Sequence, residues 1–193
     1  MSLYSAAISE ITRFLGVPFM GTAGASDSKA MDLQAAIEST LQVILSQLSK
    51  INMVHDVGFL DCADIGSLEM LVMTDEILSQ AKRIARGIEI SADTLMLDLI
   101  DEIGPGGSFI ATAETAGRCR EETFRSDLMD RNAWATWQEN GAETMLERIQ
   151  SKLAHILSRP QSIQMSKDVL DRISAVIQAA EQRQGAFAFE KTG

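Results

Sequence analysis

Polar side chains gather at the ends of two apolar runs, where they could bind an ionic ligand. The first run is followed by Ser26, Asp27 and Lys29, and the second ends in His55 and Asp56. A histidine beside a carboxylate can titrate near neutrality or donate a hydrogen bond. Ligands of α/β proteins bind at the carboxyl ends of parallel strands, so the two clusters indicate a single site.

Each of these clusters also has a purely structural interpretation. Ser26 or Asp27 could cap a helix that starts at Ser28, because serine and aspartate are favoured N-caps. Gly24 beside them allows close approach of the backbone, which would also suit a ligand. His55 could be an ordinary structural histidine.

Three further features could contribute to a site. Glu69 lies near the start of an expected helix, where the helix dipole favours an acid; it could instead pair with a cationic substrate. Phe59 is the aromatic residue nearest to the second cluster. The glycines Gly104, Gly106 and Gly107 could form an anion-binding nest, or they could simply end a helix.

The composition excludes several functional classes. The 193 residues are 46% hydrophobic and 23% charged, with a net charge of -10 and no run of basic residues. Binding to nucleic acid or to an anionic membrane is therefore not expected. No apolar stretch reaches the roughly 20 residues of a membrane span.

The two cysteines, Cys62 and Cys119, do not form a disulfide framework, so a cytoplasmic protein with reduced thiols is expected. Asp61, Cys62 and Asp64 could ligate a metal, but they lack the spacing of a zinc site and no bound metal is expected. The chain has no P-loop, dinucleotide-binding or nucleophile-elbow motif.

Hydrophobic periodicity predicts long helices separated by short strands. The expected helices span residues 4–15, 28–50, 67–86, 91–103, 132–140, 143–157 and 167–182. The expected strands span residues 17–21 and 51–54, with a possible third at 108–111. In the second helix Ile37, Leu41, Ile44 and Leu48 predict one buried stripe. A frayed tail is expected after Gly185.

Strands that alternate with long helices predict an α/β fold with parallel strands. A complete (β/α)8 barrel needs about 250 residues, and this chain supplies two or three of its eight units. The open edges of so small a sheet leave backbone groups unpaired. The chain is thus expected to be part of a larger barrel or to complete its sheet by association, as a homo-oligomer.

The sequence resembles the C-terminal part of the trimethylamine methyltransferase family. Ordered, family-like segments over residues 4–158 carry the resemblance: Gly24-Ala-Ser-Asp-Ser-Lys29, Asn52-Met-Val-His-Asp-Val-Gly58, Ser67-Leu-Glu-Met-Leu-Val72, Arg86-Gly-Ile-Glu89, Ile103-Gly-Pro-Gly-Gly107 and Leu128-Met-Asp-Arg131. The resemblance implies the last βα units of a TIM (β/α)8 barrel over residues 4–115. C-terminal helices over 116–185 and a flexible tail over 186–193 would follow.

The chain departs from the family pattern at two positions. The trimethylamine-specific enzymes carry pyrrolysine where this chain has Ala25, so it is similar to the non-pyrrolysine branch, which includes glycine betaine methyltransferase. Relatives often have histidine after Gly107, where this chain has Ser108.

The resemblance implies methyl transfer from a methylated or quaternary amine, such as glycine betaine, to the Co(I) of a corrinoid protein. Asp27, Glu69 and Phe59 would bind the ammonium group, because a quaternary ammonium is bound by carboxylates and aromatic faces. His55 or Lys29 would bind a betaine carboxylate, and Gly104, Gly106 and Gly107 would help to dock the corrinoid partner. The alternative is a catalytically incomplete barrel fragment that acts as a quaternary-amine binding or structural module.

Overall fold

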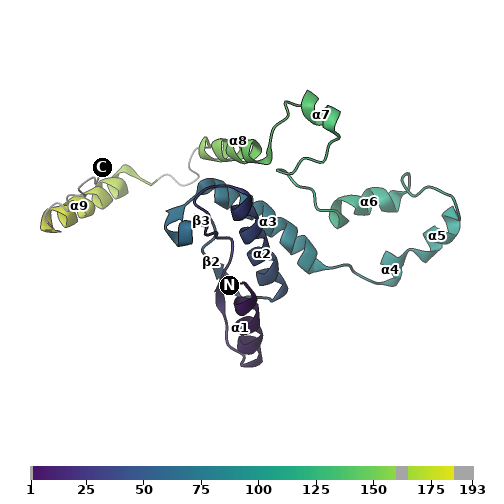
Figure 1. Ribbon diagram of the computed structural model, residues 1–193, viewed down its shortest axis with the longest axis horizontal. Helices are drawn as coiled ribbons and strands as arrows, with labels where there is room; N and C mark the ends of the chain where they lie inside the picture. Colours follow the sequence, from purple (N-terminus) through teal and green to yellow (C-terminus); the bar gives the residue numbers. More distant parts are fainter. Residues whose placement is uncertain (1, 160–164, 185–193) are drawn as a thin grey trace. The chain divides into compact units, whose positions relative to one another are not determined.

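The computed structural model describes residues 2–159 and 165–184, which form two compact units that divide between Ile156 and Leu157. Figure 1 labels most of their elements along the chain. The first unit holds α1 (Ser2–Phe14), β1 (Met20–Thr22), α2 (Leu33–Leu48), β2 (Met53–His55), β3 (Phe59–Leu60), β4 (Ile65–Gly66), α3 (Leu68–Arg86), α4 (Ala92–Leu95), α5 (Leu97–Ile103), α6 (Ala113–Glu122), α7 (Trp134–Glu139) and α8 (Met145–Leu157). The second unit holds α9 (Lys167–Gln184).

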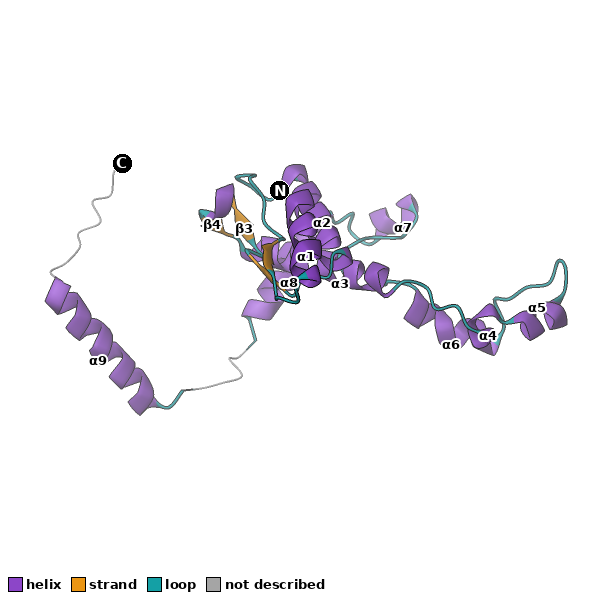
Figure 2. Cartoon of the chain, turned by 90° about the horizontal axis from the view of Figure 1, so that it is seen from below, coloured by secondary structure: helices purple, strands orange, loops and turns teal. Residues whose placement is uncertain are grey.

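The fold is α/β, with mostly helices and only short strands. The expected parallel pair is confirmed: β1 pairs with β2, with Gly21 opposite Val54 and Thr22 opposite His55. An antiparallel hairpin that was not expected follows, in which Phe59 of β3 lies opposite Gly66 of β4 (Figure 2). Because β1 and β2 run in the same direction, their carboxyl ends lie side by side.

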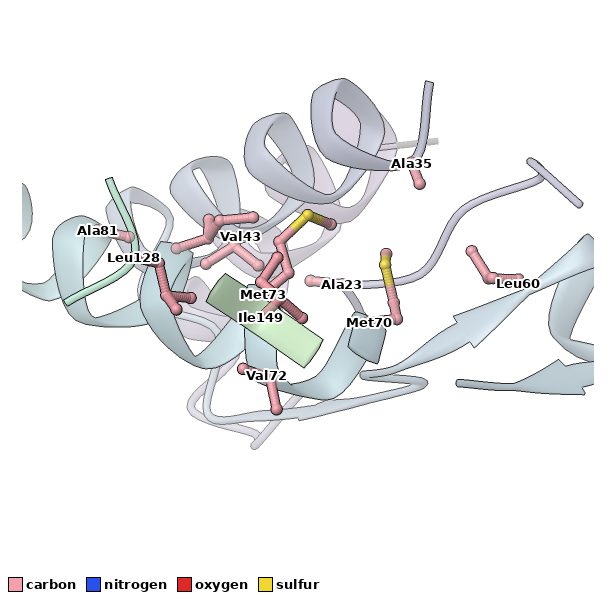
Figure 3. Close-up of a cluster of buried hydrophobic side chains, with 11 residues drawn as sticks. Ala23, Ala35, Val43, Leu60, Met70, Val72, Met73, Ala81, Leu128 and Ile149 are labelled. Carbon is pink, nitrogen blue, oxygen red and sulfur yellow. The ribbon is translucent and has the colours of Figure 1, made fainter. Parts of the chain in front are cut away.

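Helices α2 and α3 pack against each other and carry most of the core. The buried side chains of the core, most of them labelled in Figure 3, are Ala23, Ala35, Val43, Leu60, Met70, Val72, Met73, Ile77, Ala81, Leu128 and Ile149. Between the helices the hydroxyls of Ser39 and Thr74 lie 3.2 Å apart in a fully buried hydrogen bond. Small side chains such as Ala35 and Ser39 allow the two helices to approach closely.

The predicted helix over 67–86 is confirmed at both ends. Ser67 caps α3 by accepting a hydrogen bond from the Met70 amide, and Gly87 follows the last residue. The helix expected from residue 28 begins later, at Leu33, because Asp32 is its N-cap and accepts from the Ala35 amide. Capping by Ser26 or Asp27 is therefore wrong.

The buried stripe predicted for α2 is also wrong. Ile37, Leu41 and Leu48 are 60%, 56% and 53% exposed, and only Ile44 of the four is partly buried against the core. The buried residues of α2 are Ala35, Ser39, Val43 and Ser46, which lie on a different face of the helix. The periodicity located an apolar face, but α3 packs against the face with small side chains.

The predicted helix over 91–103 is interrupted at Met96, which has left-handed backbone angles and separates α4 from α5. The possible third strand at 108–111 is wrong, because those residues form bends and turns. The Thr112 amide donates to the Phe109 carbonyl, and Thr112 then caps α6, a helix that was not expected.

An arginine cluster joins the end of α3 to the end of α6. Arg83 donates from Nη1 to the Gly87 carbonyl and from Nε to the Glu122 carbonyl, both at 2.9 Å. Arg83 and Arg86 both form ion pairs with the Glu122 carboxylate. These contacts bring together the two ends of the segment that carries α4, α5 and α6.

The predicted helix over 167–182 is confirmed as α9. Within the described residues, no helix is both long and apolar enough to cross a membrane. The tail expected after Gly185 lies outside the described residues.

Candidate functional site

A cavity of about 570 Å³ lies beside the carboxyl ends of the two parallel strands. Its lining is contributed by Ser2, Thr22, Ala25, Ser26, Asp27, Glu38, Leu41, Gln42, Asp56, Cys62 and Ala63. Thr22 ends β1 and Asp56 directly follows β2, so both clusters expected from the sequence reach the cavity. The volume is that of a small-molecule site.

The loop that follows β1 is held against α2. The Glu38 Oε2 atom accepts hydrogen bonds from the Ser26 hydroxyl at 2.6 Å and from the Asp27 amide at 2.9 Å. One turn further along α2, the Gln42 Oε1 atom accepts from the Ala25 amide at 3.3 Å. The hydroxyl of Ser26 and the other hydrogen bonds lower the pKa of Glu38, so it is ionised at neutral pH.

The histidine that ends β2 connects the two strand ends. Its Nδ1 atom lies 2.7 Å from Oδ1 of Asp56, and its Nε2 atom lies 3.5 Å from the Thr22 hydroxyl. A proton on Nδ1 that is donated to Asp56 leaves Nε2 of neutral His55 able to accept from Thr22. The His55 side chain is 46% exposed, and it lies outside the lining of the cavity, although its partners Thr22 and Asp56 belong to that lining.

A thiol and an acid face each other across the loop ends. Asp27 raises the pKa of the Cys62 thiol, first through a hydrogen bond and second through its charge. Cys62 has a left-handed backbone with φ 56°, which turns the chain after β3. The short turn that contains Cys62 thereby reaches the loop after β1.

Lysine and phenylalanine of the predicted site lie beside the cavity rather than in its lining. Lys29 donates to the Asp27 carbonyl at 2.7 Å and pairs with Asp61 at 3.3 Å. Phe59 contributes its carbonyl, which accepts from the Ser26 amide at 3.0 Å, while its side chain is 37% exposed. Both residues fix the loop that carries Asp27.

Known proteins that resemble the chain are methyltransferases. The profile of the trimethylamine methyltransferase (MTTB) family matches residues 1–185. The chain belongs to this family. It is 28% identical over 182 residues to trimethylamine methyltransferase MttB of Methanosarcina barkeri strain Fusaro, covering 94% of this chain and 37% of that protein. It is 32% identical over 158 residues to glycine betaine methyltransferase of Desulfitobacterium hafniense strain Y51, covering 81% of this chain and 33% of that protein.

The chain spans about a third of the length of these relatives, 37% and 33%. In this trimethylamine methyltransferase family member, Ala25 lies in the cavity lining, between the strand end and Asp27. Ala25 is thus part of the cavity wall. Its methyl side chain offers no reactive group.

Two parts of the predicted site do not line the cavity of this family member. Glu69 lies in the first turn of α3 and accepts from the Ser67 hydroxyl at 3.1 Å. Gly104, Gly106 and Gly107 lie between α5 and α6, where the Gly107 amide donates to the Gly104 carbonyl. Of the predicted site residues, the cavity lining therefore contains Asp27, while His55, Lys29 and Phe59 lie beside it and Glu69 and the three glycines lie elsewhere.

Sequence reasoning did not find the contribution of α2 to the cavity. Glu38 and Gln42 line it, and they are four residues apart, so they lie on the same side of the helix. This spacing of two polar residues, in the helix that directly follows a strand-end cluster, was the signal available in the sequence. Leu41 of the predicted stripe also lines the cavity, beside these two polar residues.

Proposed function

We propose that the chain is the C-terminal part of a TIM-barrel methyltransferase that takes a methyl group from a methylated or quaternary amine. In this proposal the amine binds in the cavity at the carboxyl ends of β1 and β2. The acceptor is the Co(I) of a corrinoid carried by a partner protein. The observation that carries the proposal is the carboxylate-lined cavity at adjacent parallel strand ends, in a chain of this family.

The charges of the cavity favour a cationic ligand. Asp27, Glu38 and Asp56 all contribute to its lining, and Lys29 is held outside it by Asp61. A quaternary ammonium has no N–H to donate, so it is bound by charge and by contact with its methyl groups. Asp27 is the proposed counter-ion, because Glu38 is occupied by the loop and Asp56 by the histidine.

Ala25 supports a substrate that needs no covalent adduct with the protein. Its side chain has no nucleophile or electrophile, and it leaves space in the cavity wall beside the proposed counter-ion. This favours glycine betaine, which already carries an activated N-methyl group, over trimethylamine. The name of the Desulfitobacterium relative agrees with such a substrate.

His55 is the proposed donor for the carboxylate of a betaine. Its contacts with Asp56 and Thr22, which both line the cavity, fix the plane of the ring. Rotation of the Thr22 hydroxyl, or protonation of the ring, would make an N–H or O–H available to the ligand. The two ends of a betaine would then be held in one orientation, which lowers the entropic barrier of the transfer.

The corrinoid would supply the nucleophile, and the N–C electron pair would leave with the tertiary amine. The proposed contact with its carrier protein is the loop of Gly104, Gly106 and Gly107. A side chain at Gly104 or Gly106 would meet nothing within 4 Å, so the backbone there is open to a partner. The role of this chain is to hold the N–CH3 bond in line and to exclude water.

Methyl transfer to cob(I)alamin, followed by its absorbance over a panel of methylated amines, tests the proposal. His55→Ala is expected to reduce transfer from glycine betaine by about 10²-fold or more, the cost of lost orientation at a reacting centre. Asp64→Asn, a change outside the cavity, is the control. Normal turnover by the His55 variant would refute the assignment of the donor.

A second candidate is a quaternary-amine binding or structural module without activity of its own. It is favoured by the two-stranded sheet β1–β2, because in the described part of the chain neither outer edge of that sheet pairs with a further strand. A binding module would take up glycine betaine without any change in the cob(I)alamin spectrum. Light scattering decides whether the chain completes its sheet as a homo-oligomer, and an active monomer would contradict this candidate.

A further inference from the structure

Two side chains of α2 contact three consecutive residues of the loop after β1. Gln42 accepts from the amide of residue 25, and Glu38 accepts from the hydroxyl of residue 26 and from the amide of residue 27. Glu38 and Gln42 are one turn apart, so both reach the same side of the helix. Two of these three hydrogen bonds come from backbone amides of the loop, and the third comes from the Ser26 hydroxyl.

Glu38 is itself fixed and charged. Its second oxygen, Oε1, accepts from the Gln34 side chain at 2.9 Å. The hydrogen bond from Ser26 lowers the Glu38 pKa. Hydrogen bonds to an ionised acceptor are roughly twice as strong as neutral ones. The carboxylate therefore serves as a hydrogen-bond acceptor for the loop and not as a free charge of the cavity.

Ser26 connects the loop that Glu38 holds to strand β3. It is 3% exposed, its amide donates to the Phe59 carbonyl of β3, and its hydroxyl accepts from the Ser28 amide at 3.0 Å. Ser26 is fixed from both sides, while the next residue, Asp27, stays exposed at the cavity. The direction of the Asp27 carboxylate is then set by the backbone that Glu38 holds.

We propose that Glu38 and Gln42 are positioning residues of the site, which hold the loop at residues 25–27 so that the Asp27 carboxylate faces the cavity and Cys62. They act through the loop and not by contact with the reacting atoms. The ligand that Asp27 would bind rests on the proposed function. The placement of Asp27 itself does not, and it can be measured separately.

The Cys62 thiol reports where Asp27 lies. Asp27 raises the pKa of this thiol, and Cys62 is exposed and therefore accessible to reagents. If the loop is released, Asp27 moves away and the thiol pKa falls. Each unit of that fall increases the thiolate fraction about tenfold at a pH below the pKa.

The experiment measures alkylation of Cys62 by iodoacetamide from pH 7 to 10 in the full chain. A Cys119→Ser background leaves Cys62 as the one cysteine. Gln42→Ala changes no charge and is compared with Gln47→Ala on the same helix. We expect the first to increase the rate at pH 8 about threefold or more, from the loss of one hydrogen bond, and the second to leave it unchanged.

Glu38→Gln and Glu38→Ala are expected to increase the rate further, towards that of Asp27→Asn, which removes the cause directly. Glu38→Asp keeps a carboxylate at this position, so its alkylation rate should lie between those of Glu38→Ala and the unchanged protein. Far-UV circular dichroism confirms that each variant is folded. An unchanged pH profile in the Gln42 and Glu38 variants, while Asp27→Asn shifts it, would overturn the proposal.

A calorimetric titration with glycine betaine separates this inference from the proposed function. If the chain binds glycine betaine, Glu38→Ala should weaken binding about tenfold or more, while Gln47→Ala should not. Equal binding by both variants would overturn the positioning role. If neither the chain nor its variants bind glycine betaine, the proposed function fails. The pH profile of Cys62 alkylation still decides whether Glu38 and Gln42 hold Asp27.

Discussion

Replacing Gly24 by alanine tests the junction on which the cavity depends. Gly24 has φ +77°, and an added Cβ would lie 2.8 Å from the Thr74 Cγ2 atom and 3.3 Å from Val57 Cγ2. The left-handed backbone costs a residue with a Cβ about 1–2 kcal/mol. Crowding of a packed core adds about 1–3 kcal/mol. Gly24→Ala should therefore lower the free energy of unfolding by about 2–5 kcal/mol, measured by urea denaturation followed at 222 nm.

Thr74 has little room to yield, because it is 1% exposed and bound to the hydroxyl of Ser39. The matched control is Gly117→Ala in the middle of α6, where an added Cβ would meet nothing within 4 Å. That change should increase the stability of α6 by about 1 kcal/mol, since alanine is the better helix former. A loss of less than about 1 kcal/mol in Gly24→Ala would refute the packing described for this junction.

Three further changes have defined outcomes. Ser39→Ala leaves the buried Thr74 hydroxyl without its partner and should lower the free energy of unfolding by about 1–3 kcal/mol. The double variant with Thr74→Val should lose less stability in urea denaturation than the sum of the two single variants. Strictly additive losses would argue against this hydrogen bond. The Ser26 hydroxyl that donates to Glu38 lowers the pKa of this carboxyl, so near that pKa the unfolded state binds more protons than the folded state. The contribution of Glu38 to the free energy of unfolding should therefore be fully present above pH 4.5 and be lost as the pH falls through the folded pKa. An acid titration of the unfolding midpoint should show a smaller loss in Glu38→Gln, and an identical curve would contradict this. Arg83→Ala should speed cleavage by chymotrypsin between residues 88 and 121, and unchanged digestion would show that the arginine does not hold that segment.

The helix α3 and the parallel pair were predictable because local signals agree with the tertiary structure. Ser67 before the helix, Glu69 in its first turn and Gly87 after it each satisfy a helix end within the chain itself. The strands β3 and β4 are two residues long, too short for any alternating pattern to identify them. Which face of α2 is buried depends on α3, so periodicity alone could not decide it.

The candidate site was predictable where the backbone topology decides it. Parallel strands bring their carboxyl ends together, which places Asp27 and Asp56 at one cavity. The parts contributed by α2 depend on how the loop folds back onto the helix. Because Asp32, and not Ser26 or Asp27, begins the helix, the loop is longer than expected and can reach Glu38 and Gln42.

The arginine contacts at the end of α3 have a consequence for how the chain can vary. Arg83 donates to the carbonyls of Gly87 and Glu122, so one side chain holds together the two ends of the segment between them. Once such ends are closed, doubling the length of the connection costs only about 0.6 kcal/mol. The protein can therefore accept an insertion between residues 88 and 121 while the packing of α2 on α3 stays the same. The partner contact proposed for Gly104, Gly106 and Gly107 lies in this segment, so that contact can change without a change in the cavity.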